Sequence, residues 1–157
     1  MKIGILSDTH DNLPKIAAAV ATFNAARVGL VIHAGDFVAP FTIDTLSKLS
    51  CDWTGVFGNN DGERAGLTAK SGGRIKVPPL RMVFEGRKIT VVHDPATLNI
   101  AAEHADLVVY GHTHKPNVSR AGATLVVNPG DCSGWLSGES TIAFVDLAAM
   151  TAEIVSF

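Results

Sequence analysis

Four histidines, two aspartates and one asparagine share a position: each follows a short apolar run of strand length. They are Asp8, His10, Asp36, Asn59, His93, His112 and His114. Their carboxylate, imidazole and amide groups offer oxygen and nitrogen donors, which suit zinc, manganese, iron or nickel better than calcium or a metal that prefers thiolates. Chance would place one or two such side chains after strands, because polar residues commonly follow them. Seven of them after five separate strands predict a metal site.

The donor types favour two divalent ions rather than one. Two such ions about 3.5–4 Å apart, the usual spacing in phosphoester-cleaving sites, repel each other and need an anion between them. Asp36 could bridge them, because Gly35 before it lets the backbone approach closely. His112 and His114 could serve different ions if the strand end is extended, because residues i and i+2 then share a face. The seven side chains carry only two negative charges against the four positive charges of two divalent ions. A bridging hydroxide is therefore also expected, because it would neutralise more of that charge.

Alternating strands and helices are expected to position these residues. In the first part of the chain the expected strands are 3–6, 30–34 and 53–57, separated by an amphipathic helix over 13–26 and a second helix over 40–49. This order predicts a parallel sheet with right-handed crossovers. In such sheets the functional residues lie beyond the carboxyl ends of the strands, where Asp8, His10, Asp36 and Asn59 are placed.

The second half of the chain is predicted to be mostly β-structure that packs as a second sheet on the first. A polar, glycine-containing stretch over 62–73 is expected to be a mobile loop near the site. A hairpin over 81–84 and 88–93 follows, then a short helix over 95–104 and a buried strand over 107–110. Further strand-like runs cover 118–120, 125–128, 142–147 and 153–155. The sequence therefore predicts one α/β domain over residues 1–157.

Composition argues against several classes of function. The chain has 157 residues, 46% hydrophobic and 18% charged, which is enough for one substantial core. Its net charge of -2 is too small to suggest a nucleic-acid or acidic-membrane surface. The first apolar stretch, 3–6, lacks the length of a signal peptide's apolar region, and no run approaches the roughly 20 residues of a spanning helix. Cys51 and Cys132 lack a C-x-x-C spacing and are expected to be reduced. A cytoplasmic protein is therefore expected.

The motifs around these residues resemble those of the calcineurin-like metallophosphoesterases, in particular the small single-domain phosphodiesterase branch. The matching motifs, in the family's order, are Asp8-x-His10, Gly35-Asp36, Gly58-Asn59-Asn60-Asp61, His93, Gly111-His112-Thr113-His114 and Asn128-Pro129-Gly130. The resemblance implies a two-sheet β-sandwich flanked by helices, in four α/β/β/α layers. It also implies one ion held by Asp8, His10, Asp36 and His114, and another held by Asp36, Asn59, His93 and His112.

The resemblance implies hydrolysis of a P–O bond by a hydroxide that bridges two divalent metals. Manganese is the expected metal, with nickel, iron or zinc as alternatives. The expected substrate is a small-molecule phosphodiester or another phosphoester, and no membrane partner is expected. Whether the chain forms a homo-oligomer is left open by the sequence.

Three departures from the family pattern bear on function. Asn60 stands where the phosphomonoesterase branches have a histidine that helps to protonate the leaving group. Asparagine cannot supply that proton, so diesters and activated aryl esters are expected, and Asn60 could contact a phosphoryl oxygen instead. Asp94 stands where the family usually has glycine; it could orient an imidazole or act on a metal-bound water, but a cap on the turn at Pro95 is favoured. The Pro-Arg pair that often follows the Asn-Pro-Gly turn in this branch is missing from 131–139. The loop is therefore not expected to bind phosphate as it would in the family.

Two other functions stay open on these residues. A hydrolase of phosphoric anhydrides, such as dinucleotide polyphosphates, would use the same metals and nucleophile. A non-catalytic protein-binding scaffold, like the retromer subunit of this fold, is the second alternative, although that branch has lost several ligands that this chain keeps. His33, inside a strand, is expected to pack or to orient a neighbour rather than to bind metal.

Overall fold

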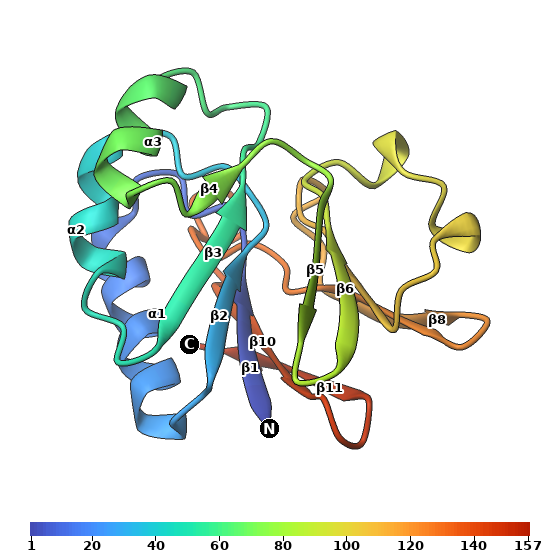
Figure 1. The fold of residues 1–157 in the computed structure, drawn as a ribbon. Coiled ribbons are helices and arrows are strands. Elements are labelled where there is room, and N and C mark those ends of the chain that lie inside the picture. Colours follow the sequence, from blue (N-terminus) through green and yellow to red (C-terminus); the bar gives the residue numbers. More distant parts are fainter.

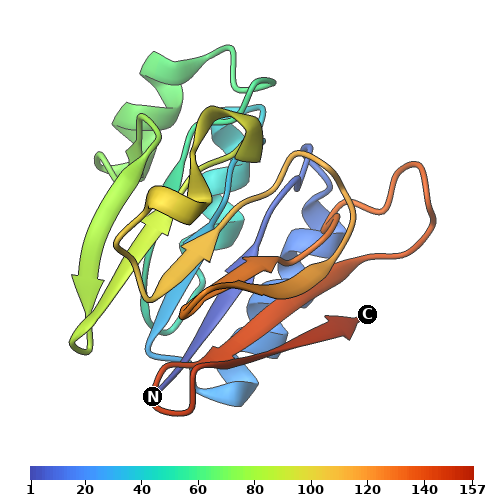
Figure 2. The same ribbon diagram turned by 90° about the vertical axis from the view of Figure 1, so that its right-hand side faces the viewer.

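Two β-sheets packed face to face, with helices over the outer face of the first, make up the computed structural model, which describes residues 1–157 (Figures 1 and 2). The helices are α1 (Leu13–Ala26), α2 (Ile43–Leu46) and α3 (Arg64–Ser71). The strands are β1 (Lys2–Leu6), β2 (Leu30–His33), β3 (Asp52–Val56), β4 (Ile75–Lys76), β5 (Leu80–Phe84), β6 (Arg87–Val91), β7 (Leu107–Val109), β8 (Asn117–Ala121), β9 (Thr124–Asn128), β10 (Thr141–Asp146) and β11 (Thr151–Ser156). This arrangement confirms the predicted two-sheet α/β fold.

The first sheet has the strand order β11-β10-β1-β2-β3-β4, and the second has the order β5-β6-β7-β9-β8. Strands β1 to β4 run parallel, as do β6, β7 and β9 in the second sheet. Strands β10 and β11 were expected in the second sheet, and this expectation was wrong. They extend the first sheet because β10 pairs antiparallel with β1, with Ala143 opposite Ile5. An apolar run predicts a strand but does not determine which strand pairs with it.

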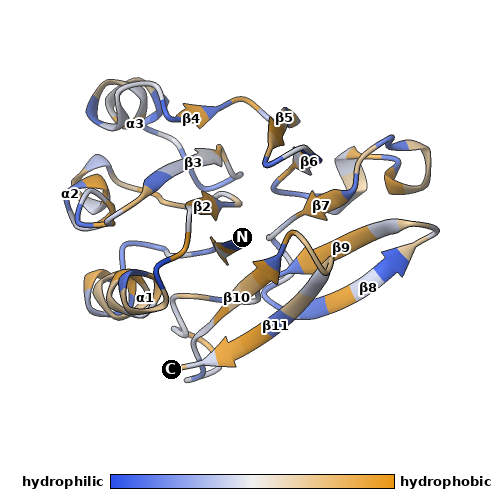
Figure 3. Cartoon of the chain, turned by 60° about the horizontal axis from the view of Figure 1, so that its bottom comes forward, coloured by the Kyte–Doolittle hydropathy of each residue, from blue (hydrophilic) through white to orange (hydrophobic).

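Strand β1 lies between two hydrophobic cores. Ile3 and Ile5 belong to the cluster between the two sheets, whereas Leu6 belongs to the cluster under the helices. Gly4 faces α1, where a Cβ atom would lie 2.5 Å from the ring of Phe23, so only glycine lets the helix pack this closely. The mainly hydrophobic colour of β2, β7 and β10 reflects the same burial (Figure 3). Strands buried on both faces give the loops beyond them a rigid support.

Three segments differ from the sequence prediction. Residues 62–73, expected as a mobile loop, contain helix α3, because Leu67 is fully buried against the first sheet's core and Gly72 ends the helix with a φ of 62°. Residues 95–104, expected as one helix, form two 3-10 turns, Pro95–Thr97 and Ile100–Ala102. The layer outside the second sheet is therefore thin. The predicted second helix is also shorter, because a 3-10 turn at Pro40–Thr42 precedes α2. No helix has both the length and the apolar character needed to cross a membrane.

Candidate metal centre

The five strand ends that carry the predicted metal ligands converge at one end of the two sheets. Strands β1, β2 and β3 of the first sheet and β6 and β7 of the second all point to this end, the upper one in Figure 1. The two sheets therefore bring together side chains that lie far apart in the chain, such as those of Asp8 and His114. Asp8, Asp36 and His93 are buried, His10 and His114 are partly exposed, and Asn59 and His112 are exposed. The cluster is open to solvent on one side.

A first group of donors gathers around Asp8. His114 Nε2 lies 3.4 Å from Asp8 Oδ1, and His10 Nε2 lies 3.8 Å from the same oxygen. His10 Nε2 is also 3.6 Å from Asp36 Oδ2, and the rings of His10 and His114 stack with their centroids 5.3 Å apart. Asp8, His10 and His114 together form a group that could hold a metal ion.

A second group of donors gathers around Asn59. His93 Nε2 and His112 Nδ1 each lie 2.9 Å from Asn59 Oδ1. His93 Nε2 is also 3.4 Å from Asp36 Oδ2, and Asp8, Asp36 and His93 form a further group that could hold a metal ion. His93 Nδ1 donates to the Ala34 carbonyl at 2.8 Å, which directs the Nε2 atom towards the oxygens.

Asp36 lies between the two groups, with Oδ2 facing both. The other oxygen, Oδ1, accepts from the Asn60 backbone N–H at 2.9 Å, and the Asn60 side-chain amide donates to Oδ2 at 2.7 Å. Gly58 allows this approach, because a Cβ atom there would overlap the Asp36 side chain. Gly35 serves His93 instead, since its Cβ would lie 2.5 Å from His93 Nδ1. The close approach attributed to Gly35 from the sequence thus involves both glycines.

The donor spacing and the hydrogen bonding both fit metal ions. Two donors that bind one ion at about 2.0–2.2 Å lie roughly 3.0–3.6 Å apart, close to the separations within both groups. Asp8 Oδ1 and His10 Nε2 are buried and have no hydrogen-bond partner. Buried polar atoms nearly always have a partner. The missing partner of these two atoms is therefore expected to be a bound metal ion rather than another group of the protein.

The backbone at five predicted ligands adopts positive φ angles, a conformation that L-residues rarely take. The values are 55° at Asp8, 39° at His10, 63° at Asp36, 66° at His112 and 57° at His114. Such angles cost energy and concentrate at functional sites. They also show that the extended strand end, which was the condition for His112 and His114 to serve different ions, is absent. These two side chains do enter different groups, but through tight turns rather than an extended strand end.

Two carboxylates that sequence reasoning did not single out hold the ligand loops in place. Asp131 Oδ2 lies 3.2 Å from His114 Nδ1, and its other oxygen accepts from the backbone and side chain of Ser133. Asp61 accepts from the backbone N–H groups of Asp36, Gly58 and Val38 at 3.1, 2.7 and 2.7 Å. Asp61 was read only as part of a motif, and nothing in the sequence marks Asp131, because its partner is distant in the chain.

His33 connects the loop after β1 to the loop after β2. Its Nδ1 accepts from the Gly35 N–H at 3.1 Å, so Nε2 carries the proton and donates to Thr9 Oγ1 at 3.0 Å. Thr9 in turn donates to the Asp36 carbonyl at 3.3 Å, and the His33 ring stacks on Phe37. Complete burial lowers the pKa of His33 well below its ordinary value, which keeps the ring neutral. The expectation that His33 packs and orients a neighbour is confirmed.

The charges of the centre shift the pKa values of its members. Burial tends to raise the pKa of Asp36. Hydrogen bonds from His93 and Asn60 outweigh this effect and lower the pKa well below its usual range. Burial also opposes the charged form of His93, yet the hydrogen bond and charge of Asp36 raise the pKa of this histidine. Burial raises the pKa of Asp8, although Ser7 and the neighbouring histidines partly offset it. Asp36 is therefore a fixed anion, as a bridging ligand needs to be.

The remaining sequence expectations concern residues outside the centre. Asp94 accepts from the Ala96 N–H at 2.8 Å and caps the turn at Pro95, as favoured from the sequence. Cys51 and Cys132 are both free, and burial raises the pKa of Cys132 to about 12. Asn128 ties the Asn-Pro-Gly turn to the histidine loop by donating to the Gly111 carbonyl at 3.0 Å.

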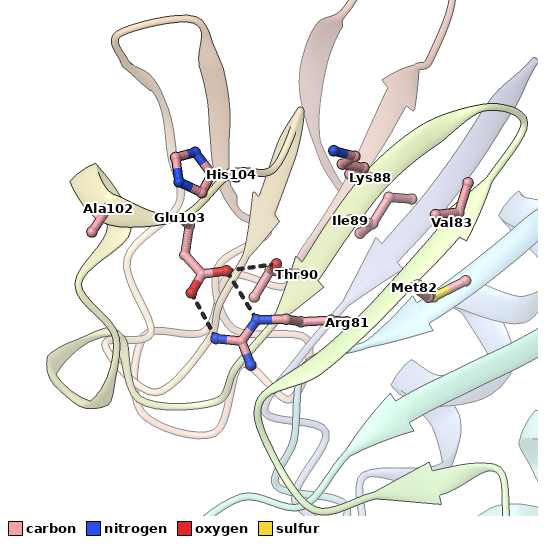
Figure 4. Close-up of a pocket in the computed structure, with 9 residues that line it drawn as sticks. All are labelled: Arg81, Met82, Val83, Lys88, Ile89, Thr90, Ala102, Glu103 and His104. Atoms are coloured by element: carbon pink, nitrogen blue, oxygen red, sulfur yellow. Dashed lines mark hydrogen bonds and ion pairs between the residues drawn. The ribbon is translucent and has the colours of Figure 1, made fainter.

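The largest cavity lies elsewhere, beside strands β5 and β6 (Figure 4). Its volume is about 480 Å³, and none of the predicted ligands lines it. Figure 4 shows Arg81 forming two hydrogen bonds to Glu103, at 2.7 and 3.2 Å, while Thr90 donates to Glu103 at 3.0 Å. Two of the charged side chains that line this cavity, Arg81 and Glu103, are thus already paired with each other.

Comparison with known proteins identifies the family. Residues 1–150 match the calcineurin-like phosphoesterase superfamily domain. A protein named as a phosphodiesterase in Methanocaldococcus jannaschii is 40% identical over 154 residues, which cover 93% of each chain. A probable metallophosphoesterase of Methanothermobacter thermautotrophicus is 30% identical over 138 residues, or 83% of this chain and 76% of that one. The chain therefore belongs to the calcineurin-like phosphoesterase superfamily.

Solved structures agree with this assignment. A structure described as a novel archaeal phosphodiesterase has a TM-score of 0.92 and 36% identity, and the match covers 100% of both chains. A variant of Vps29 from Entamoeba histolytica has a TM-score of 0.72 at 19% identity, covering 100% of this chain and 99% of that one. At this low identity the second likeness shows a shared fold alone. The predicted family and its two-sheet fold are both confirmed.

Proposed function

We propose that this protein is a metal-dependent phosphodiesterase with a dinuclear centre. The observation that carries the proposal is the position of Asp36, whose Oδ2 atom lies 3.6 Å from His10 Nε2 on one side and 3.4 Å from His93 Nε2 on the other. A single buried carboxylate oxygen facing two groups of donors is the arrangement that a bridging ligand requires. The 40% identical archaeal relative, named as a phosphodiesterase, supports the same activity.

In this proposal each ion has four ligands from the chain. Asp8, His10, Asp36 and His114 would hold the first, and Asp36, Asn59, His93 and His112 would hold the second. When bound, two divalent ions lower the pKa of a bridging water towards neutrality and stabilise negative charge on the phosphoryl oxygens. Manganese is the metal we favour, over nickel, iron or zinc, and a cytoplasmic location is part of the same proposal.

The remaining residues orient the centre and its substrate. His93 Nδ1 donates to the Ala34 carbonyl, and His114 Nδ1 lies 3.2 Å from Asp131 Oδ2, which keeps the Nε2 atom of each ring directed at the centre. The Asn60 amide, which donates to Asp36 Oδ2 here, would contact a phosphoryl oxygen of the substrate. Since an amide supplies no proton to a leaving group, diesters and activated aryl esters are preferred over esters with basic leaving groups.

We also treat residues 1–157 as one metallophosphoesterase domain. Support comes from the family match over 1–150 and from β10 and β11, which return from the end of the chain to pair beside β1. The ligand set takes residues from both sheets, so neither sheet alone would form the centre.

An activity screen with manganese-loaded protein tests the proposal. We expect hydrolysis of bis(p-nitrophenyl) phosphate that EDTA abolishes and manganese restores, with much slower turnover of an alkyl monoester such as glycerol 2-phosphate, whose basic leaving group needs a proton. Faster hydrolysis of dinucleotide polyphosphates than of any diester would favour the anhydride alternative. Protein that contains both metals yet hydrolyses neither class would favour the binding scaffold and would contradict the proposal.

A further inference from the structure

A second cavity, of about 380 Å³, opens directly beside the metal centre. It is lined by His10, His114, Asp131, Ser133, Trp135 and Leu136. Its volume lies within the range of small-molecule sites. Two of the proposed metal ligands line it, so a substrate whose phosphorus sits at the ions would extend one of its groups into this cavity.

Two large apolar side chains stand exposed at this cavity. Trp135 is 64% exposed and Leu136 is 93% exposed. The indole is held in place, because its Nε1–H donates to the His10 carbonyl at 2.9 Å. The loop behind it is closed by a hydrogen bond from the Gly138 N–H to the Gly134 carbonyl at 2.9 Å. A fixed aromatic surface beside a reaction centre is suited to stacking against a flat ligand.

The polar groups of the cavity favour an uncharged occupant. Asp131 already accepts hydrogen bonds from Ser133 and Gly134, and its Oδ2 lies 3.2 Å from His114 Nδ1. No lysine or arginine lines the cavity, so a second phosphate would find no cation there. The polar part of the substrate therefore belongs at the metal centre, and an apolar part belongs against Trp135.

We infer that Trp135 and Leu136 form a subsite for a planar aromatic group of the phosphoester, whether an aryl ring or a nucleobase. The inference rests on the proposed function and specifies its substrate class. Trp135 is then a specificity-determining residue that contacts the substrate by stacking, and Leu136 covers the edge of the same ring.

Phosphonates that resist hydrolysis test the subsite by binding alone. Phenylphosphonate and methylphosphonate present the same head group to the ions and differ only in the aromatic ring. By calorimetry with manganese-loaded protein, we expect phenylphosphonate to bind about tenfold more tightly, a preference typical of stacking on one aromatic side chain. Adenosine 5′-monophosphate against ribose 5-phosphate forms a second pair, which reports on a nucleobase rather than an aryl ring.

Two variants separate stacking from support of His10. In Trp135→Ala the preference for phenylphosphonate should fall below about twofold, whereas Trp135→Phe, which keeps a ring but has no N–H donor, should retain most of it. Val83→Ala is a matched control, because Val83 is 67% exposed on β5 and lies outside this cavity. It should keep the full preference. Phenylphosphonate should also quench the tryptophan emission of the wild type but not of Trp135→Phe, whose remaining Trp53 is only 6% exposed.

The outcomes distinguish this inference from the function on which it rests. Equal affinity for both members of each pair, or an equal loss of both phosphonates in Trp135→Ala, would overturn the aromatic subsite while leaving the metal centre intact. Binding of neither phosphonate to metal-loaded protein would contradict the proposed phosphoester site itself, and the subsite would fall with it.

Discussion

The metal centre and the largest cavity both gather charged side chains, but they differ in how those side chains are satisfied. At the centre, buried Asp8 Oδ1 and His10 Nε2 have no partner, and five ligand residues keep unfavourable positive φ angles. In the cavity beside β5 and β6, Arg81 and Glu103 satisfy each other at 2.7 and 3.2 Å. Unpaired buried polar atoms cost stability, so a protein keeps them where a ligand will complete them. The reaction is therefore expected at the metal centre rather than in the cavity beside β5 and β6.

The largest effect should come from removing the charge of Asp36. In Asp36→Asn the hydrolysis of bis(p-nitrophenyl) phosphate should fall by at least about a thousandfold, because a neutral amide cannot screen two cations from each other. Asp44→Asn is a matched control: Asp44 is 69% exposed and pairs only with Lys70, and its loss should change activity by less than about twofold. If Asp36→Asn keeps a tenth of the wild-type rate, Asp36 is not needed as a bridging ligand, and the contrast between the metal centre and the paired cavity fails.

A smaller effect is expected from Asp131, which acts through His114. Asp131→Asn should weaken manganese binding by about 10- to 100-fold, because the carboxylate no longer fixes the His114 ring. Calorimetric titration of manganese measures this change. Asp146→Asn is the control, since Asp146 also caps a turn, by accepting from the Ala148 and Ala149 N–H groups, but is not near any proposed ligand. Lower thermal stability with unchanged manganese affinity would mean that Asp131 only supports its loop.

The sequence predicted which residues meet at the centre but not how they are held. Asp8, Asp36 and His93 could be predicted because each ends a buried strand, and parallel strands place their carboxyl ends together. Their supports could not, because Asp131 and His114 are brought together only by the folded chain. The positive φ angles were missed for a related reason: nothing local marks Asp8 or His112 as left-handed, and the surrounding contacts impose that conformation.

The errors in the fold have similar causes. Helix α3 has a single fully buried apolar residue, Leu67, so its sequence resembles that of a polar loop. Its helical state depends on packing against the first sheet's core rather than on a periodic pattern. Strands β10 and β11 were recognised as strands, but β1, which pairs with β10 and so places both strands in the first sheet, lies at the opposite end of the chain. Strand pairing over such distances is not readable from apolar runs.

A pH-dependent effect should appear in the metal-free protein through His93. Because Asp36 raises the pKa of His93, protonation of this ring stabilises the fold fully below its unfolded pKa of about 6.5. That stability is lost as the pH rises through the higher folded-state pKa. In EDTA, the wild-type Tm should therefore decline on going from about pH 6 to about pH 9, and manganese affinity should rise over the same interval. His93→Gln should have a flatter Tm profile; identical profiles would contradict this assignment.

The smallest effect is expected in the paired cavity. Arg81→Ala should change the hydrolysis rate by less than about twofold and lower the Tm only slightly, because the Arg81 side chain is 57% exposed and solvent screens its pair with Glu103. Lys70→Ala, which breaks another surface pair, is the control for a loss of stability without loss of activity. A large loss of activity in Arg81→Ala would show that the larger cavity also takes part in the reaction.

The number of manganese ions bound per folded chain tests the central claim most directly. Equilibrium dialysis followed by elemental analysis of the wild-type protein should give two ions per chain, and Asp36→Asn should give fewer. A folded wild-type protein that binds one ion or none at saturating manganese would contradict a dinuclear centre built on Asp36.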